Sequence, residues 1–157
     1  MDRKDSSGEG MWPMVPVTSI SEVPARFASL FDQVTLKGQE VICESAQMSG
    51  PRRASIISTQ LLEEWLAEGY RFSPKMEYDE PTKSWQVFLD EISIYTWADD
   101  KATAAEQALD LALDYARDYL DRLDLFLEIP YRRRHYPYLL RLAHATARDE
   151  ARKVLGL

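Results

Sequence analysis

Apolar and polar residues alternate at different periods along the chain, and these periods divide it into two units. In the first unit a short strand at 14–17 precedes apolar residues that recur every three or four positions, which predicts a helix with one face in the core. The apolar positions of this helix are Phe27, Leu30, Phe31 and Val34. Runs at 39–46 and 54–58 predict an antiparallel hairpin, because a Gly-Pro pair interrupts the chain between them. A short helix over 59–69 follows.

The second unit begins near residue 72 with a period of two. The sequence predicts strands at 75–79, 85–92 and 93–97, separated first by a turn that contains a proline. In the middle strand two sets of side chains alternate, as expected where successive residues point to opposite faces of a sheet. One set is Trp85, Val87 and Leu89, and the other is Gln86, Phe88 and Asp90.

A long helix is predicted over 103–124. The spacing of Thr103 and Glu106 matches a capping box, in which a hydroxyl and a carboxylate each bind a free backbone N–H group. Its apolar stripe consists of Ala105, Ala108, Leu109, Ala112, Leu113, Ala116, Tyr119, Leu120 and Leu123, and its opposite face carries Asp110, Asp114, Asp118 and Asp121. After a break at Pro130, a single final helix is predicted from Pro137 to the C-terminus.

The composition is that of a folding chain with an uneven charge distribution. Hydrophobic residues make up 45% of the 157 residues, and the formal net charge is −7. From Tyr131 onward, however, seven Arg or Lys residues face two carboxylates. The basic residues of the last helix have two interpretations: they bind nucleic acid, or they form ion pairs with the acidic face of the long helix. These residues are Arg141, Arg148 and Arg152. Internal ion pairing is the preferred interpretation.

The sequence offers little catalytic chemistry. His135 and His144 lie apart from any set of Cys, Asp or Glu with metal-ligand spacing, and we interpret both as structural or surface residues. Cys43 lies in a predicted strand and is expected to be an inert thiol, and the aspartates of the long helix are expected to form a solvated face. We therefore expect no enzyme activity, no metal and no cofactor. With one cysteine and neither a signal peptide nor an apolar membrane span, the chain is expected to be cytoplasmic, without a membrane partner.

The first unit resembles a known family. The segments "SISEVPARFASLFDQV", "GQEVICES" and "RRASIISTQLLEEWL" resemble the prevent-host-death (Phd/YefM) type II antitoxins over about residues 15–67. Ser21 and Glu22 match the start of the family's helix, and the run from Ile56 to Ser58 matches its second strand. The resemblance implies a homodimer that forms through this unit, operator DNA as a ligand and a cognate toxin as a protein partner.

The residues that could contact DNA follow from the same resemblance. They are Thr18, Ser19, Ser21, Arg26, Arg52 and Arg53. The sequence departs from the family at two places: Pro24 replaces the arginine expected in the helix, and the hairpin is longer and carries Glu44. Few phosphate contacts are therefore available.

The second unit has a weaker resemblance, to HicB-type antitoxin domains. It rests on Asp79, Glu80, Trp85, the Thr103 and Glu106 cap, and the Ala108-Leu109 pair. We therefore predict an α+β fold, in which a Phd/YefM-like small sheet with helices precedes a ββ(β)α HicB-like module and a C-terminal helix. The predicted organisation is a flexible tail over 1–14, a dimerisation and DNA-binding domain over 15–70, and a strand-helix module over 71–157.

Two functions remain open at this point. In the first, the protein is an antitoxin that neutralises a partner toxin and represses its own operon by binding DNA. In the second, it is a non-catalytic protein-interaction module that has the antitoxin fold without DNA binding.

Overall fold

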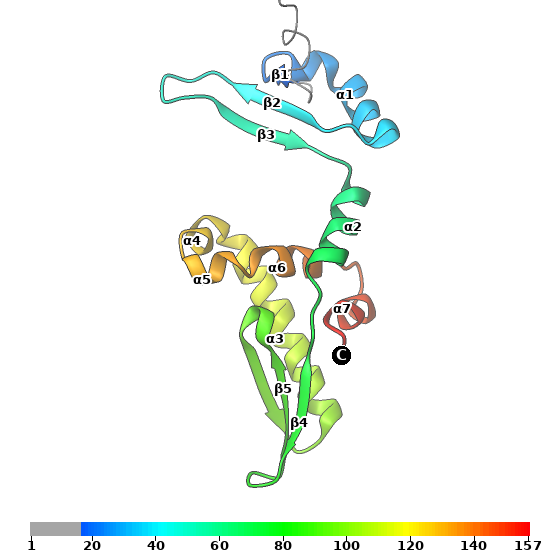
Figure 1. Ribbon diagram of the computed structural model, residues 1–157, viewed down its shortest axis with the longest axis vertical. Helices are drawn as coiled ribbons and strands as arrows, with labels where there is room; N and C mark the ends of the chain where they lie inside the picture. Colours follow the sequence, from blue (N-terminus) through cyan, green and yellow to red (C-terminus); the bar gives the residue numbers. More distant parts are fainter. Residues whose placement is uncertain (1–16) are drawn as a thin grey trace, which may run out of the picture. The chain divides into compact units, whose positions relative to one another are not determined.

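The computed structural model describes residues 17–157, which form an α+β fold in two compact units (Figure 1). The division falls after Leu62, inside helix α2 (Thr59–Gly69), whereas the sequence placed the domain boundary at residue 70. The predicted tail over 1–14, and most of the strand predicted at 14–17, lie outside the described residues. Each unit has its own sheet and its own core, and the two are described in turn.

The first unit is a three-stranded sheet with one helix. Strand β1 (Val17–Ser19) pairs in parallel with β2 (Val41–Ser45), which pairs antiparallel with β3 (Arg52–Ile56), so the predicted hairpin is confirmed. Helix α1 (Val23–Lys37) connects the two parallel strands. A proline lies in its first turn, where a missing N–H group costs nothing, and Gly38 ends it at a φ of 66° in the left-handed region.

The core of the first unit is small, and this corrects one prediction. Leu30 and Val34 of α1 are buried against Val41 of the sheet. Phe27 and Phe31, which were predicted to lie in the same core, are instead 55% and 53% exposed. A sheet of three short strands covers only one line of side chains along the helix, and the two phenylalanines lie on the neighbouring line.

The second unit is an antiparallel sheet packed on a long helix (Figure 1). Its strands are β4 (Lys75–Asp79), β5 (Ser84–Leu89) and β6 (Ile94–Ala98), in that order, with the short 3₁₀ helix η1 (Asp90–Ile92) between the last two. Helix α3 (Lys101–Asp121) covers one face. The predicted alternation of β5 is confirmed: Val87 and Leu89 are fully buried and Trp85 packs against the same core.

Helix α3 begins one turn earlier than the capping box predicted. Its N-cap is Asp100, whose carboxylate accepts hydrogen bonds from the Thr103 backbone N–H at 2.8 Å and the Thr103 hydroxyl at 2.6 Å. These hydrogen bonds hold the pKa of Asp100 below its ordinary value. Glu106 takes no part in the cap, because its carboxylate accepts from the guanidinium of Arg148 at 2.7 Å and also pairs with Arg152.

This pairing decides the role of the C-terminal basic residues. Arg148 also binds Asp110 at 2.7 Å, and Arg141 donates to the Tyr70 carbonyl at 2.9 Å. Internal ion pairing is therefore confirmed for Arg148 and for Arg152, its neighbour one turn away. Asp114 and Asp118, which continue the acidic face of α3, pair with arginines of their own helix region.

The C-terminal part folds into short helices, not one. Helices α4 (Leu123–Leu127) and α5 (Pro130–Arg133) precede α6 (Tyr136–Ala143) and α7 (Arg148–Leu155). The predicted single final helix is wrong, because the chain is extended at Ala147. Thr146 donates from its N–H and its hydroxyl to Glu150, at 2.7 and 2.9 Å, and this local bonding starts a new helix.

Aromatic side chains join these helices to α3. Tyr119 of α3 is fully buried, its ring stacks on Phe126 at 4.8 Å between centroids, and its hydroxyl donates to the Arg132 carbonyl at 2.8 Å. His135 is buried beside them, with Nδ1 2.8 Å from the Tyr115 hydroxyl. Within 17–157, no helix combines the length and apolarity that crossing a membrane requires.

The two faces of α3 give a matched test of the core. Leu109 is fully buried, so truncation in Leu109→Ala leaves a cavity and should lower the free energy of unfolding by roughly 2–5 kcal/mol. Leu111 of the same helix is half exposed, and Leu111→Ala should change it by no more than about 0.5 kcal/mol. Chemical denaturation measures both, and equal losses would contradict the burial of this face.

His135 predicts a pH dependence of stability. Its burial, with the nearby charge of Arg132 as a second cause, holds the pKa of His135 below its ordinary value, so the folded state favours the neutral ring. The stabilisation is complete above pH ~6.5, the unfolded pKa, and falls as the pH drops toward the folded pKa, by at most about 1.4 kcal/mol per pH unit. Denaturation between pH 7 and 5 should show this slope, and His135→Gln should reduce it. The same slope in both proteins would contradict the prediction.

Candidate functional site

The residues predicted to contact DNA lie at two places in the first unit: the start of α1, and the β2–β3 hairpin. Ser19 and Ser21 are exposed, and their Oγ atoms lie 2.9 Å apart, within hydrogen-bond distance. Thr18 precedes them in β1, pairs in register with Cys43 of β2, and is only 3% exposed. The Thr18 side chain is therefore part of the interior, whereas the two serines are open to solvent.

Arg26 lies one turn into α1 and already has a carboxylate partner. Its guanidinium is 3.8 Å from Glu22 in an i, i+4 pair, and both side chains are about half exposed. Pairs of this kind contribute little and are screened by salt, so a phosphate could replace the carboxylate at small cost. Ser21, Glu22 and Arg26 thus share one end of the helix.

Arg53 belongs to a row of residues that crosses the whole sheet. Ser19 of β1 pairs with Glu44 of β2, and Glu44 pairs with Arg53 of β3. The Arg53 Nε atom is 3.0 Å from the Glu44 carboxylate. The one acid that departs from the family pattern therefore neutralises one of the two hairpin arginines.

Arg52 lies on the opposite face of the sheet from Arg53. Successive residues of a strand point to opposite faces, and Arg52 shares its face with Val41 and Ile56, which pack toward α1. Within residues 17–157 Arg52 forms no ion pair and no side-chain hydrogen bond. The hairpin thus presents one uncommitted positive charge on one face and one compensated charge on the other.

The exposed apolar face of α1 is a feature that sequence reasoning missed. Phe27 and Phe31 lie one turn apart with ring centroids 6.1 Å from each other, and more than half of each side chain is exposed. The sequence feature that could have revealed it is the width of the helix's apolar surface. The apolar residues form two adjacent lines along the helix, and a sheet of three short strands covers only one of them. Contiguous exposed apolar side chains of this size mark an interaction surface.

The described residues hold no candidate metal centre. Over 17–157, no group of three or more His, Cys, Asp or Glu side chains has an arrangement that could bind a metal ion. His144 instead lies 3.1 Å from the Glu63 carboxylate, and His135 contacts Tyr115. Cys43 is half-buried in β2, in the predicted strand.

Comparison with known proteins agrees with this fold. A PHD-like family model, described as an antitoxin of a RelE/RelB toxin–antitoxin system, matches residues 14–157 and so covers both units. The chain also resembles the 1.80 Å crystal structure of an antitoxin of a proposed toxin/antitoxin system from Syntrophomonas wolfei subsp. wolfei. That likeness has a TM-score of 0.73 at 17% sequence identity, and covers 89% of this chain and 96% of the other.

No curated protein matches the chain. The structural likeness, at its low identity, shows a shared fold, and the family match extends over nearly the whole sequence. With both units inside a single family match, the chain belongs to the PHD-like family of antitoxins of RelE/RelB toxin–antitoxin systems.

Proposed function

We propose that this antitoxin neutralises a partner toxin, forms a homodimer through its first unit and represses its own operon by binding DNA with that unit. In this proposal residues 15–70 act as a Phd/YefM-like dimerisation and DNA-binding domain, and residues 71–157 act as a HicB-like module. The role is regulatory and not catalytic, and the site of action is the cytoplasm. The antitoxin family supplies the toxin partner, and the remaining steps are argued from the residues.

The observation that carries the proposal is the exposed phenylalanine pair of α1. Phe27 and Phe31 each expose more than half of their surface, although large apolar side chains contribute most to stability when buried. A homodimer interface is isologous, so the same face of a second copy would cover this one. The apolar core of the first unit is small: among the described residues it has three buried members, with two partly buried neighbours. Such pairing would enlarge it.

DNA binding would use the polar end of the same unit. Ser19 and Ser21 can bind phosphate oxygens, and Arg52 carries a charge that no described carboxylate compensates. A dimer doubles each of these groups. The contacts remain few, and the chain as a whole is acidic, so the complex should form at low salt and weaken steeply as salt is added.

Neutralisation of the toxin is supported by charge. The chain carries 26 acidic and 19 Lys or Arg side chains, so acidic side chains are in excess and the formal net charge is −7. An acidic surface speeds encounter with a basic protein. A toxin with a basic surface is therefore the partner that this chain fits.

The oligomeric state tests the phenylalanine face. Wild-type protein should elute with twice the chain mass of 18.1 kDa in size-exclusion chromatography with light scattering, and the double variant Phe27→Ser with Phe31→Ser should shift to a single chain mass. Leu125→Ser is the matched control, since Leu125 is 51% exposed on α4, outside the proposed dimerisation domain, and should leave the mass unchanged. A wild-type monomer, or a dimer that survives the double substitution, would contradict dimerisation through α1.

DNA binding is tested with the DNA upstream of the protein's own gene. Removing Arg52 in Arg52→Ala should weaken binding and reduce the slope of log affinity against log salt by about 2, one contact for each protomer of a dimer. Arg117→Ala is the control, because Arg117 pairs with Asp114 on the surface of α3 in the second unit. Absence of a specific complex at low salt would remove the DNA step and leave the alternative, an interaction module without DNA binding.

A further inference from the structure

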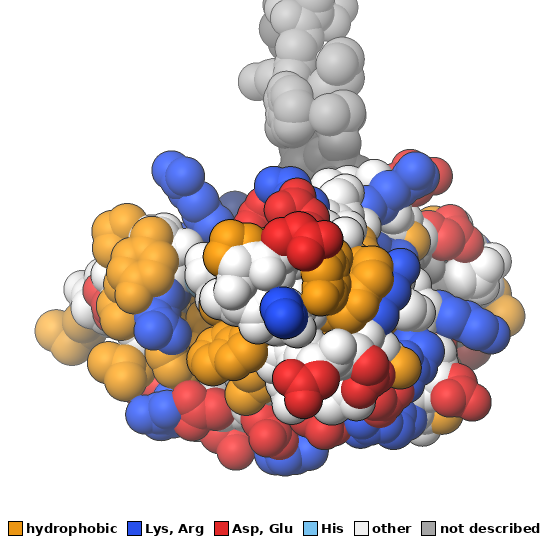
Figure 2. Space-filling model, turned by 90° about the horizontal axis from the view of Figure 1, so that it is seen from below, with side chains coloured by type: hydrophobic (Ala, Val, Ile, Leu, Met, Phe, Trp, Pro, Cys, Tyr) orange, Lys and Arg blue, Asp and Glu red, His pale blue; other side chains and the backbone are white. Residues whose placement is uncertain are grey.

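The second sheet has an open face that the fold does not use. Helix α3 covers the sheet face that carries Val87 and Leu89. Because successive side chains of a strand point to opposite faces, the residues that alternate with these two lie on the other face of the sheet. Pairing in register places these outward side chains in rows. One row runs Lys75, Phe88, Tyr95, and the next runs Glu77, Gln86, Trp97. Viewed from below, the molecule shows hydrophobic side chains open to solvent among charged ones (Figure 2).

Three aromatic rings form a continuous ladder on this face. The centroids of Phe88 and Tyr95 are 4.8 Å apart, and those of Tyr95 and Trp97 are 5.5 Å apart with ring planes 29° from parallel. Tyr95 is 43% exposed and Trp97 is 61% exposed, so the ladder ends in an accessible indole. Neither ring belongs to the core that packs on α3.

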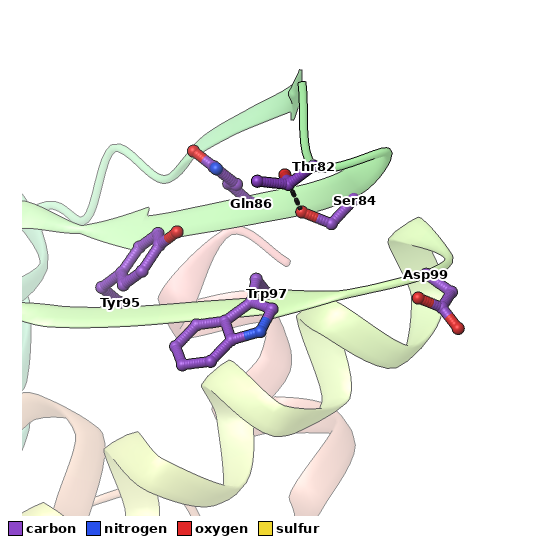
Figure 3. A pocket seen from close by; sticks show the side chains of 6 residues that line it. All are labelled: Thr82, Ser84, Gln86, Tyr95, Trp97 and Asp99. Carbon is purple, nitrogen blue, oxygen red and sulfur yellow. Dashed lines mark hydrogen bonds between the residues drawn. The ribbon is translucent and has the colours of Figure 1, made fainter. Parts of the chain in front are cut away.

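A cavity of about 430 Å³ lies beside the end of the ladder, between β5 and the end of β6 (Figure 3). Its lining combines the two exposed rings with small polar groups: Thr82, Ser84, Gln86, Tyr95, Trp97 and Asp99. The hydroxyls of Thr82 and Ser84 lie 2.8 Å apart and hold each other in place on one side. Asp99 stands on the other side, after the last residue of β6.

Two hydrogen-bonding groups of this lining have no partner in the described chain. Over residues 17–157, neither the Asp99 carboxylate nor the Gln86 amide forms a side-chain hydrogen bond or an ion pair. In this respect Asp99 differs from the adjacent Asp100, whose carboxylate caps α3. The cavity therefore offers a carboxylate and an amide oxygen beside an exposed, electron-rich indole, which is an environment that suits a cation.

Charge around the cavity favours the same ligand. Residues 75–100 contain seven carboxylates and two lysines, so a phosphate chain would be repelled although bases could stack on the rings. The protein already places cations on its own aromatic rings. Lys101 lies 5.2 Å from the centroid of Trp85 on the other side of this sheet, and Arg132 lies 5.5 Å from that of Tyr131.

We propose that this cavity is a docking site for an arginine-bearing basic segment of the partner toxin. The guanidinium would stack on the exposed Trp97 indole at the end of the ladder and donate to Asp99 and to the Gln86 amide oxygen. Arginine suits the site better than lysine because its planar group stacks on an aromatic ring while donating in its own plane. The identity of the partner as a toxin rests on the proposed function, whereas the cationic specificity rests on the cavity alone.

The test uses the full-length protein and a synthetic peptide of alternating glycine and arginine as the probe. Titration calorimetry should detect binding that weakens about tenfold in Trp97→Ala and in Asp99→Asn. Two matched controls, Trp65→Ala and Asp114→Asn, remove an exposed indole and an exposed carboxylate elsewhere in the second unit and should leave the affinity unchanged. A glycine and lysine peptide should bind more weakly than the arginine peptide.

A second arm separates this inference from the proposed function. The product of the neighbouring gene is expressed with wild-type protein or with Trp97→Ala, and cell growth is measured. Failure of the wild-type protein to restore growth would contradict toxin neutralisation. The peptide titration would still show whether the cavity binds a cationic segment. Restoration by wild type and equal restoration by Trp97→Ala would overturn the toxin as occupant.

Three other results would overturn the cationic site. These are no peptide binding, equal peptide affinity in Trp97→Ala and wild type, and tighter binding of single-stranded oligothymidine than of the arginine peptide. Because Trp97 and Asp99 are exposed, circular dichroism should show that both variants keep the fold.

Discussion

The alanine face of α3 is the contact on which the second unit depends. Ala104, Ala108 and Ala112 are fully buried, and their small side chains let the helix lie close to β5 and β6. Larger residues at these positions would separate the layers and expose Val87 and Leu89. Since one face of the sheet is committed to this contact, the other face is left open, and that is where the aromatic ladder lies.

In the first unit, by contrast, the helix leaves much of its apolar surface uncovered. Its helix buries one line of side chains against a three-stranded sheet and leaves Phe27 and Phe31 in solvent. A core of this size contributes little stability by itself, since small cores bury a small fraction of their chain's surface. The same residues that make the unit incomplete as a monomer make it suitable for pairing with a second copy.

Ion pairs separate the charged residues that maintain the fold from those available for partners. Glu106 and Asp110 are occupied by Arg148, and Glu44 is occupied by Arg53. Net charge alone would count all of them as available. What remains uncommitted in the described chain includes Arg52 on one face of the first sheet and Asp99 at the end of β6, which are the groups that the two proposals use.

The sequence by itself determined the α+β class, the hairpin, the meander and the long helix, because each rests on local periodicity and on turn residues that act within a few positions. It also identified the family resemblance of the first unit as that of an antitoxin. Only the tertiary structure decided which apolar line of α1 is covered, where the last helix breaks, and which charges are paired. Arg148 and Glu106 lie 42 residues apart, and no local pattern encodes a contact that forms only when two helices pack together.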